Sequence, residues 1–173
     1  MSPILIASLS LLVVLGMMLV EWRISTRNER RLRHAGAIEP VQDVYSTMQW
    51  VYPAAFVVMA LEGAVFGSGS RATTLAGALL MTASKALKFW AIASLGWRWT
   101  FRVLVVPGAP LVAHGPYATM RHPNYIAVIG ELVSMAVLVN AWVTGPLATV
   151  LFSLLLRSRI SVENRALRHP ACS

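Results

Sequence analysis

The sequence predicts an all-α integral membrane protein with about five transmembrane helices. Hydrophobic residues make up 57% of the 173 residues and charged residues only 13%, whereas ordinary soluble domains carry about 25% charged residues. Apolar segments recur along the chain, and the longer ones have the length that crosses a hydrocarbon core of about 30 Å. Lys and Arg cluster between these segments, as they do in the loops of membrane proteins.

Composition also excludes several other classes of protein. Cys172 is the single cysteine, so a disulfide-stapled module and a structural zinc cluster are excluded, and we expect no metal. The net charge of +8 is compatible with nucleic-acid binding, but the basic residues flank apolar segments, where they meet anionic headgroups. We therefore expect membrane lipids as partners and no nucleic acid.

The first predicted helix covers 4–20 and is followed directly by Glu21, Trp22 and Arg23. No basic residue precedes it, so it lacks the charged start of a cleaved signal peptide and we interpret it as a retained span. A polar segment, 21–49, separates it from a second span over 50–66.

Three further spans are predicted after the Gly and Ser residues at 67–70. The third covers 73–95, and the fourth and fifth, over 125–139 and 142–156, form a hairpin around Asn140. The connector over 96–124 is long for so small a protein, which is typical of functional segments. Its residues 99–106 have the composition of a strand, 107–110 form a turn, and 111–117 return the chain.

The distribution of positive residues predicts the orientation. The 21–49 segment holds five Arg, the 67–72 loop only Arg71, the 96–124 connector three Arg, and the residues after 156 four more. Because Lys and Arg disfavour translocation, the N-terminus is expected outside, and the connector and the C-terminus in the cytoplasm.

Four charged residues fall inside predicted spans: Glu62, Lys85, Lys88 and Glu131. An unpaired charge near the bilayer centre costs about 3 kcal/mol, so these side chains should face protein, water or one another. The two lysines share a helical face, and Glu131 is the expected counter-ion of one of them. We favour structural pairing over catalysis, with snorkelling of the lysines as a further alternative.

Two polar groups could carry chemistry. The first is the segment 114–125, which combines two imidazoles, a guanidinium and two phenols at the cytoplasmic mouth of the fourth span. The second is Arg159 with Glu163, which stand at i and i+4 if the fifth helix continues past the membrane. That pair is either an exposed ion pair or a site where Arg159 binds an anionic group and Glu163 a cationic or hydroxyl-bearing one.

These motifs carry a family resemblance. Leu95-Gly96, Gly115-Pro116-Tyr117, the run from Arg121 to Tyr125 and the run from Arg159 to Glu163 occur in one order over roughly the C-terminal half. Together they resemble the isoprenylcysteine carboxyl methyltransferase family of integral membrane methyltransferases. The sequence of residues 97–112 is most similar to a bacterial branch associated with O-methylation of alkylpyrones, which implies a bacterial inner membrane.

The resemblance implies S-adenosylmethionine in a cytoplasmic pocket formed by the connector and the C-terminal helix, with a lipophilic substrate entering sideways between helices. It makes Arg159 the substrate-binding and catalytic residue, and Arg102 falls near another cofactor contact. It divides the chain into 1–95, which builds the substrate groove, and 96–173, the methyltransferase core. The cofactor-binding residues that it implies are Ala109, Pro110, Leu111, Val112, Tyr117, His122, Pro123, Asn124, Tyr125 and Glu163.

Two departures from the family pattern concern the C-terminal end. Asn164 stands where the family commonly has a second glutamate, and the usual Gly-x-Tyr tail is absent. Two alternatives follow: either the branch closes the cofactor pocket with a short tail, or the lid is incomplete and the pocket is impaired.

The expected reaction needs little acid–base help. A carboxylate or an acidic enol is already anionic at neutral pH, so Arg159 needs only to orient it. A less acidic phenol would need a base, with His114 or His122 as the candidates. Two rival interpretations remain: an NADPH-dependent membrane sterol or steroid reductase, which has a similar Arg-His-Pro-Asn-Tyr segment, and a non-catalytic membrane scaffold.

Overall fold

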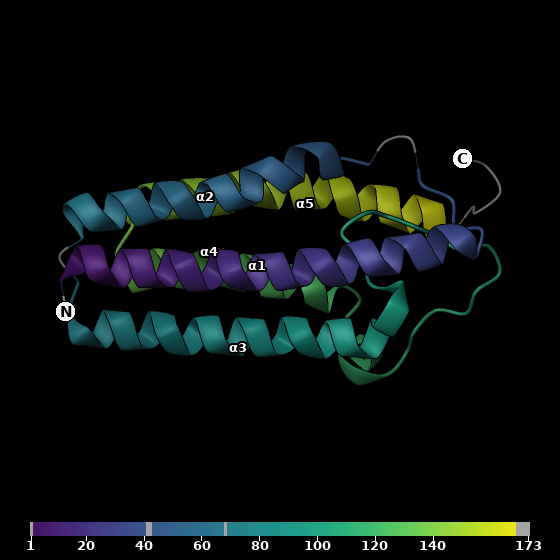
Figure 1. Cartoon of the computed structure of the whole chain (residues 1–173), viewed down its shortest axis with the longest axis horizontal. Helices are drawn as coiled ribbons and strands as arrows, with labels where there is room; N and C mark the ends of the chain where they lie inside the picture. The colour runs from purple at the N-terminus through teal and green to yellow at the C-terminus, as the bar shows by residue number, and fades with distance from the viewer. Residues whose placement is uncertain (1, 41–42, 68, 169–173) are drawn as a thin grey trace.

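The computed structural model describes residues 2–40, 43–67 and 69–168. Within them the chain forms an antiparallel assembly of α-helices and has no strand (Figure 1). Two short 3₁₀ helices, η1 (Gly96–Arg98) and η2 (Gly115–Ala118), lie in the connector. The five helices are α1 (Pro3–His34), α2 (Tyr45–Phe66), α3 (Arg71–Leu95), α4 (Pro123–Val139) and α5 (Thr144–Arg168).

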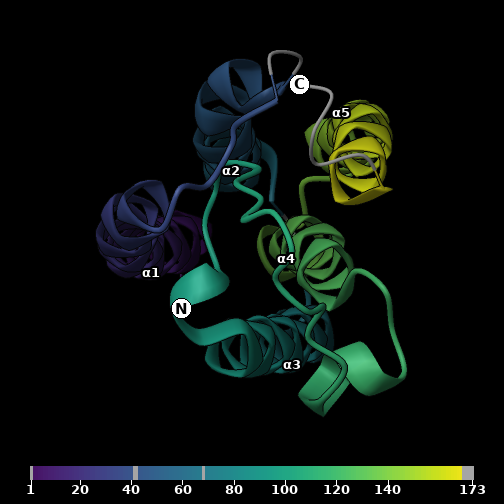
Figure 2. The same cartoon turned by 90° about the vertical axis from the view of Figure 1, so that its right-hand side faces the viewer.

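Helix α4 lies at the centre, and the other four helices surround it (Figure 2). Its residues Leu132 and Met135 are fully buried. With 17 residues it is about 25 Å long, shorter than the other four helices, each of which is long and apolar enough to cross a membrane. The protein is therefore an integral membrane protein in which the central helix contacts mainly protein.

Two glycines allow the neighbouring helices to approach α4 closely. A Cβ at Gly77 of α3 would lie 2.5 Å from the backbone of Leu138, and one at Gly63 of α2 would lie 2.5 Å from the carbonyl oxygen of Val139. Small residues at such contacts let membrane helices pack backbone to backbone. Close packing here fixes α2 and α3 against the C-terminal end of α4.

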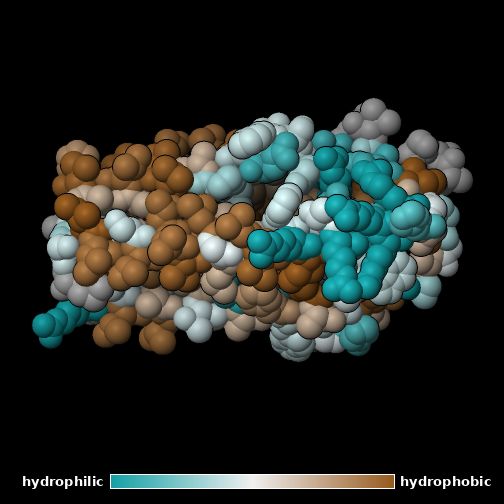
Figure 3. All heavy atoms as spheres, in the orientation of Figure 1, coloured by the Kyte–Doolittle hydropathy of each residue, from teal (hydrophilic) through white to brown (hydrophobic). Residues whose placement is uncertain are grey.

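The polar connections gather at one end of the assembly. The segment 35–44, the connector and the C-terminal end of α5 lie together, while the start of α1 lies at the opposite end (Figure 1). The surface in Figure 3 is mostly apolar over the half that holds the start of α1 and mostly hydrophilic over the other half. The predicted grouping of basic segments on one side is confirmed, and their cytoplasmic location stays a prediction.

Several predicted boundaries were wrong. Helix α1 continues past residue 20 to His34, so the polar connection shrinks from 21–49 to 35–44, because Arg and Glu are good helix formers and no Gly or Pro interrupts them before Gly36. Helix α5 continues past its apolar span to Arg168, which meets the condition under which Arg159 and Glu163 stand at i and i+4. The tail residues 169–173, with Cys172, lie outside the described residues.

The strand-like composition of 99–106 does not produce a strand in the described part of the chain. Val105 forms one isolated antiparallel bridge with Ile38, whose two backbone hydrogen bonds measure 2.9 and 3.0 Å. A strand needs a partner of similar length, and the 35–44 segment offers only this one pair.

The intramembrane charges form one closed cluster, which we call the charge cluster: Glu21, Lys85, Lys88 and Glu131. Each lysine Nζ lies 2.8 Å from Glu21, and the Nζ atoms of Lys85 and Lys88 lie 2.9 and 3.2 Å from Glu131. The Tyr52 hydroxyl donates a further hydrogen bond of 2.8 Å to Glu131. The predicted pairing of Glu131 with a lysine is confirmed, with both lysines instead of one, and Glu21 is an additional member.

Glu62 has a different structural role. Its carboxylate accepts hydrogen bonds from the backbone N–H groups of Val143 and Thr144, at 2.9 and 2.7 Å. These groups begin α5, where an acidic side chain caps the free N–H groups and complements the helix dipole. Glu62 therefore caps α5.

Candidate active site

A cavity of about 1080 Å³ enters the assembly from its polar end. Its wall is built by residues of all five α-helices and the connector, so it joins segments far apart in the sequence. Ligand pockets in proteins commonly measure about 300–1,000 Å³. The space is therefore large enough for a nucleoside cofactor and part of a second molecule.

One arm of this cavity is apolar and reaches the lipid-facing surface. It is lined by Leu15, Leu19 and Trp22 of α1, Trp50 of α2 and Phe152 of α5. Leu19, Trp22 and Trp50 are also exposed on the outer surface of the helices, by 60, 53 and 73%. The rim of the cavity therefore includes side chains of α1 and α2 that meet the hydrocarbon of the membrane.

The polar arm gathers the residues that the family resemblance pointed to. All of them except Pro123 line the cavity: Ala109, Pro110, Leu111, Val112, Tyr117, His122, Asn124, Tyr125, Arg159 and Glu163. Pro123 is buried and begins α4. The structure thus brings three separate motifs into the wall of one cavity, while their roles stay predictions.

The start of α4 positions three of these side chains. His122 is the N-cap residue and Pro123 occupies the first helical turn, where its missing N–H is no loss and its fixed φ favours the helix. The His122 ring stacks on Tyr125 with ring centres 5.3 Å apart. The side-chain oxygen of Asn124 is buried without a hydrogen-bond partner among the described residues, so the wall contains an acceptor that needs a donor.

Tyr125 links α4 to α5. Its hydroxyl donates to Glu163 Oε2 at 2.8 Å and accepts from Arg159 Nε at 3.1 Å. The i and i+4 spacing therefore presents both side chains of α5 to one phenol, as predicted. Glu163 Oε2 also lies 3.6 Å from His122 Nδ1.

The alternative that Arg159 and Glu163 form an exposed ion pair is wrong. The side chain of Arg159 is 6% exposed, and its Nη1 lies 3.0 Å from the carboxylate of Asp43. Arg159 also donates to the carbonyl oxygen of Phe101 in the connector. The guanidinium is thus held by three different segments of the chain.

The polar face of α1 fixes the connector, which sequence reasoning missed. Asn28 donates to the carbonyl oxygens of Trp99 and Gly96 at 2.8 and 3.2 Å, and Ser25 accepts from the backbone N–H of Phe101 at 2.8 Å. A signal was present, because the uncharged Ser25 and Asn28 follow Glu21 at i+4 and i+7, which puts the three side chains on one face of a helix. Helix α1 therefore helps to build the site, not only the apolar groove.

Arg102 lies at the edge of the cavity and is tied to acidic residues. Its Nη1 and Nε lie 2.7 Å from Glu39 and 3.6 Å from Glu29, and its guanidinium lies over the ring of Tyr45, 4.7 Å from the ring centre. Burial would raise the pKa of Glu39, but hydrogen bonds from Arg102 and Arg33 outweigh it and lower that pKa. Glu39 is thus held as an anion beside the connector.

Two further titratable residues occupy different environments. Burial, and to a smaller extent the charge of Glu163, raise the pKa of Tyr117 above its usual value, so this phenol stays neutral and can donate a hydrogen bond into the cavity. His114 is exposed and does not line the cavity. Its suggested role as a base is therefore not compatible with the structure.

Comparison with known proteins identifies the family of the chain. Residues 76–169 match the isoprenylcysteine carboxyl methyltransferase (ICMT) family. The chain belongs to the ICMT family. It is 32% identical over 148 residues to YpbQ, an uncharacterized protein of Bacillus subtilis, covering 86% of this chain and 88% of that protein.

An uncharacterized protein of Haemophilus influenzae is 24% identical over 147 residues, 84% of this chain and 86% of its own length. Membership of the ICMT family makes this protein a membrane methyltransferase in general terms, and such enzymes generally use S-adenosylmethionine. The matched region contains the connector, α4 and α5. The polar face of α1 and the segment 35–44 lie outside it.

Proposed function

We propose that this protein transfers the methyl group of S-adenosylmethionine to an acidic oxygen of a lipophilic small molecule. The observation that carries the proposal is one continuous cavity with two unlike arms. Its polar arm is lined by Tyr117, His122 and Glu163, and its apolar arm reaches the lipid-facing rim at Trp22 and Trp50. A water-soluble cofactor and a membrane-dissolved acceptor would meet where the arms join.

The polar arm fits the cofactor chemically. Glu163, with a side chain that is 30% exposed, supplies a carboxylate for the hydroxyl groups or the positive charge of S-adenosylmethionine. The unpaired side-chain oxygen of Asn124 suits an N–H donor such as an adenine amino group. The backbone of 109–112 lies at the same arm, held through the hydrogen bond of 2.5 Å from Arg98 to the carbonyl oxygen of Pro110.

When bound, S-adenosylmethionine would supply an electrophilic methyl carbon on a sulfonium; the acceptor oxygen would form the O–CH₃ bond as the S–CH₃ bond breaks, and the sulfur would leave with that electron pair as S-adenosylhomocysteine. The chain's own residues hold the acceptor oxygen in position and exclude water, which supplies much of the rate in such reactions. Arg159 lines the cavity and orients the anionic oxygen by hydrogen bonds, without transferring a proton. A less acidic acceptor would need a base, and His122 lies at the cavity wall for that role.

The acceptor is either a carboxylate, as the family name suggests, or the acidic enol of an alkylpyrone or a related polyketide lipid. Both put an anionic oxygen on a hydrocarbon body, which matches an arginine at one end of an apolar arm. In this proposal residues 96–173 supply the cofactor site and residues 1–95 the acceptor groove, with additional support for the connector from α1. In this proposal the site lies at the cytoplasmic face of a bacterial inner membrane, and the excess of Arg in the segments at this end supports the orientation.

The test is methyl transfer by the detergent-purified protein from S-adenosylmethionine labelled in its methyl group. Acceptors of equal chain length with a carboxylate, a hydroxypyrone or a primary alcohol are compared. We expect label in the carboxylate or the hydroxypyrone and not in the alcohol, and we expect Arg159→Gln to reduce transfer by about 100-fold. Arg157→Gln, two residues away at an exposed position of α5, is the matched control.

Label in the alcohol alone, or transfer that survives Arg159→Gln, would contradict the proposal. Saturable binding of NADPH without any response to S-adenosylmethionine would favour the reductase. Tolerance of Ala at Tyr117, His122, Arg159 and Glu163 without loss of any small-molecule binding would favour the scaffold.

A further inference from the structure

The buried partner of Arg159 comes from outside the region that matches the ICMT family. Asp43 belongs to the segment 35–44 that precedes α2, and its side chain is only 5% exposed. Its Oδ1 accepts from Arg159 Nη1 at 3.0 Å and from the backbone N–H of Tyr45 at 3.1 Å, and its Oδ2 accepts from the backbone N–H of Val103 at 3.0 Å. One carboxylate thus joins α5, the start of α2 and the connector.

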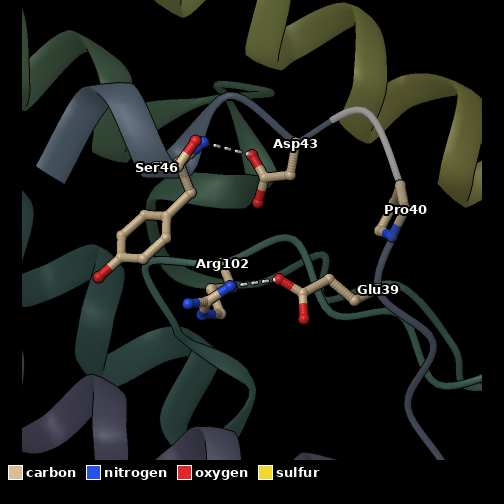
Figure 4. A pocket seen from close by; sticks show the side chains of 6 residues that line it. Glu39, Pro40, Asp43, Ser46 and Arg102 are labelled. Atoms are coloured by element: carbon tan, nitrogen blue, oxygen red, sulfur yellow. Dashed lines mark hydrogen bonds and ion pairs between the residues drawn. The ribbon is translucent and has the colours of Figure 1, made fainter.

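Asp43 approaches Arg159 from outside the large cavity. Figure 4 shows Asp43 in the wall of a second, polar cavity of about 330 Å³, together with Glu39 and Arg102. Asp43 does not line the large cavity, and Arg159 does not line the small one. The contact between the two side chains therefore leaves the cavity side of Arg159 to other ligands.

The hydrogen bonds of Arg159 leave part of its guanidinium available. A guanidinium has five N–H groups, of which Nε donates to Tyr125, one N–H of Nη1 to Asp43 and one of Nη2 to the carbonyl oxygen of Phe101. One N–H remains on each terminal nitrogen. These two can bind two oxygens of a ligand, or one oxygen and a water molecule.

We propose that Asp43 is a positioning residue for methyl transfer, which holds Arg159 by one edge and offsets its charge so that the acceptor anion is oriented without being bound too tightly. The inference rests on the proposed function of Arg159 as the residue that binds the acceptor. An acceptor oxygen loses its negative charge as the O–CH₃ bond forms and the S–CH₃ bond breaks. Strong attraction to an uncompensated arginine would therefore stabilise the anionic reactant more than the transition state and slow the reaction.

The charge of Asp43 acts on the acceptor only through its contact with Arg159. Removing that charge should therefore strengthen the binding of an anion instead of weakening it. Asp43→Asn keeps the size of the side chain but removes the negative charge next to Arg159. An anion in the cavity should then bind more tightly, whereas loss of a purely structural contact would weaken binding of every ligand. The sign of the change separates the two roles.

The experiment is equilibrium binding of dodecanoate to the full chain in phosphatidylcholine nanodiscs, by calorimetry, with empty nanodiscs subtracted. Dodecanol is the neutral control, and the variants are Asp43→Asn, Arg159→Gln and the double variant. We expect Asp43→Asn to tighten dodecanoate binding by about tenfold without changing dodecanol binding. We expect Arg159→Gln to weaken dodecanoate binding, and the double variant to match Arg159→Gln, because Asp43 acts through Arg159.

A second readout uses turnover. With an acceptor that the protein methylates, Asp43→Asn should lower both KM and kcat. Asp43→Glu, which restores the charge on a longer side chain, should return KM to the wild-type value. Unfolding of Asp43→Asn would be detected by loss of dodecanol binding. In that case Asp43→Glu, which keeps the charge, is the variant to test. It must leave the affinity for dodecanoate unchanged and lower kcat.

Two results would overturn the inference, and they are distinguishable. If Arg159→Gln weakens dodecanoate binding but Asp43→Asn leaves it unchanged or weakens it, Asp43 does not moderate Arg159, and the proposed role of Arg159 stands. If neither variant changes dodecanoate binding, Arg159 does not bind the acceptor anion, and the proposed function of this residue fails together with the inference.

Discussion

The charge cluster lets the effect of one substitution be worked out from the structure. Glu131 is fully buried and balances two lysines, with its oxygens 2.9 Å from Lys85 Nζ and 3.2 Å from Lys88 Nζ. Glu131→Gln keeps the size of the side chain and removes one of the two negative charges, so two buried lysines would share Glu21 alone. Breaking a buried ion pair in this way costs about 3–5 kcal/mol.

For a protein of this size, each kcal/mol corresponds to about 2–4 °C in Tm, so Glu131→Gln should lower Tm by about 10 °C. The measurement is thermal unfolding in detergent, followed by circular dichroism. Glu39→Gln is the control, because it removes a partly exposed pair with Arg33 and Arg102, which contributes about 1 kcal/mol or less. A Tm of Glu131→Gln within about 1 °C of the wild type would refute the reasoning.

Two double variants test the same cluster further. Glu131→Gln combined with Lys85→Met removes one charge of each sign, leaves the pair of Lys88 with Glu21, and should recover more than half of the lost Tm. A charge swap between Lys85 and Glu131 should restore nothing, because it places one acidic side chain against Glu21 and one lysine against Lys88. Recovery by the swap would mean that Glu21 contributes little to the cluster.

Three further predictions concern packing, the site and pH. Gly77→Leu should destabilise the protein by about 3 kcal/mol or more, measured by unfolding in detergent, because even a Cβ would meet the backbone of Leu138; a stable variant would contradict the close contact of α3 with α4. Tyr125→Phe, which removes the hydroxyl between Arg159 and Glu163, should weaken S-adenosylhomocysteine binding by about tenfold in calorimetry, and unchanged affinity would show that the phenol does not organise the site. The pKa of Glu39 is lowered, so its carboxylate stabilises the protein above its usual pKa of about 4.3, and this stability is lost as pH falls through the lowered value. The Tm difference between the wild type and Glu39→Gln should therefore shrink on acidification. A difference that stays constant would contradict the direction of the pKa shift.

The number of helices and their apolar cores could be predicted from hydropathy, because that signal is local. Helix ends were harder, since the second half of α1 is polar on its buried face as well as its exposed face, so hydropathy ends the apolar span at residue 20 while the helix continues to His34. The central place of α4 could not be predicted from its own residues, because an apolar helix surrounded by lipid and one surrounded by other helices have similar sequences.

The residues of the candidate site could be located because three motifs keep their order and spacing. Their supporting partners could not be predicted in the same way. Asp43 and Glu21 carry no motif, and their contacts with Arg159 and Lys88 depend on how α1 and α2 pack against later helices. In a single sequence, long-range ion pairs of this kind are visible only as polar residues at positions where a buried apolar residue is expected.

The central claim is that the polar arm of the cavity binds S-adenosylmethionine. Calorimetric titration of the detergent-purified protein with S-adenosylhomocysteine tests it most directly, with Glu163→Gln as the site variant and Arg157→Gln as the control at an exposed position of the same helix. We predict saturable binding to the wild type and to Arg157→Gln, and at least about tenfold weaker binding to Glu163→Gln. Absence of binding to the folded wild type, or equal affinity for all three proteins, would contradict the claim.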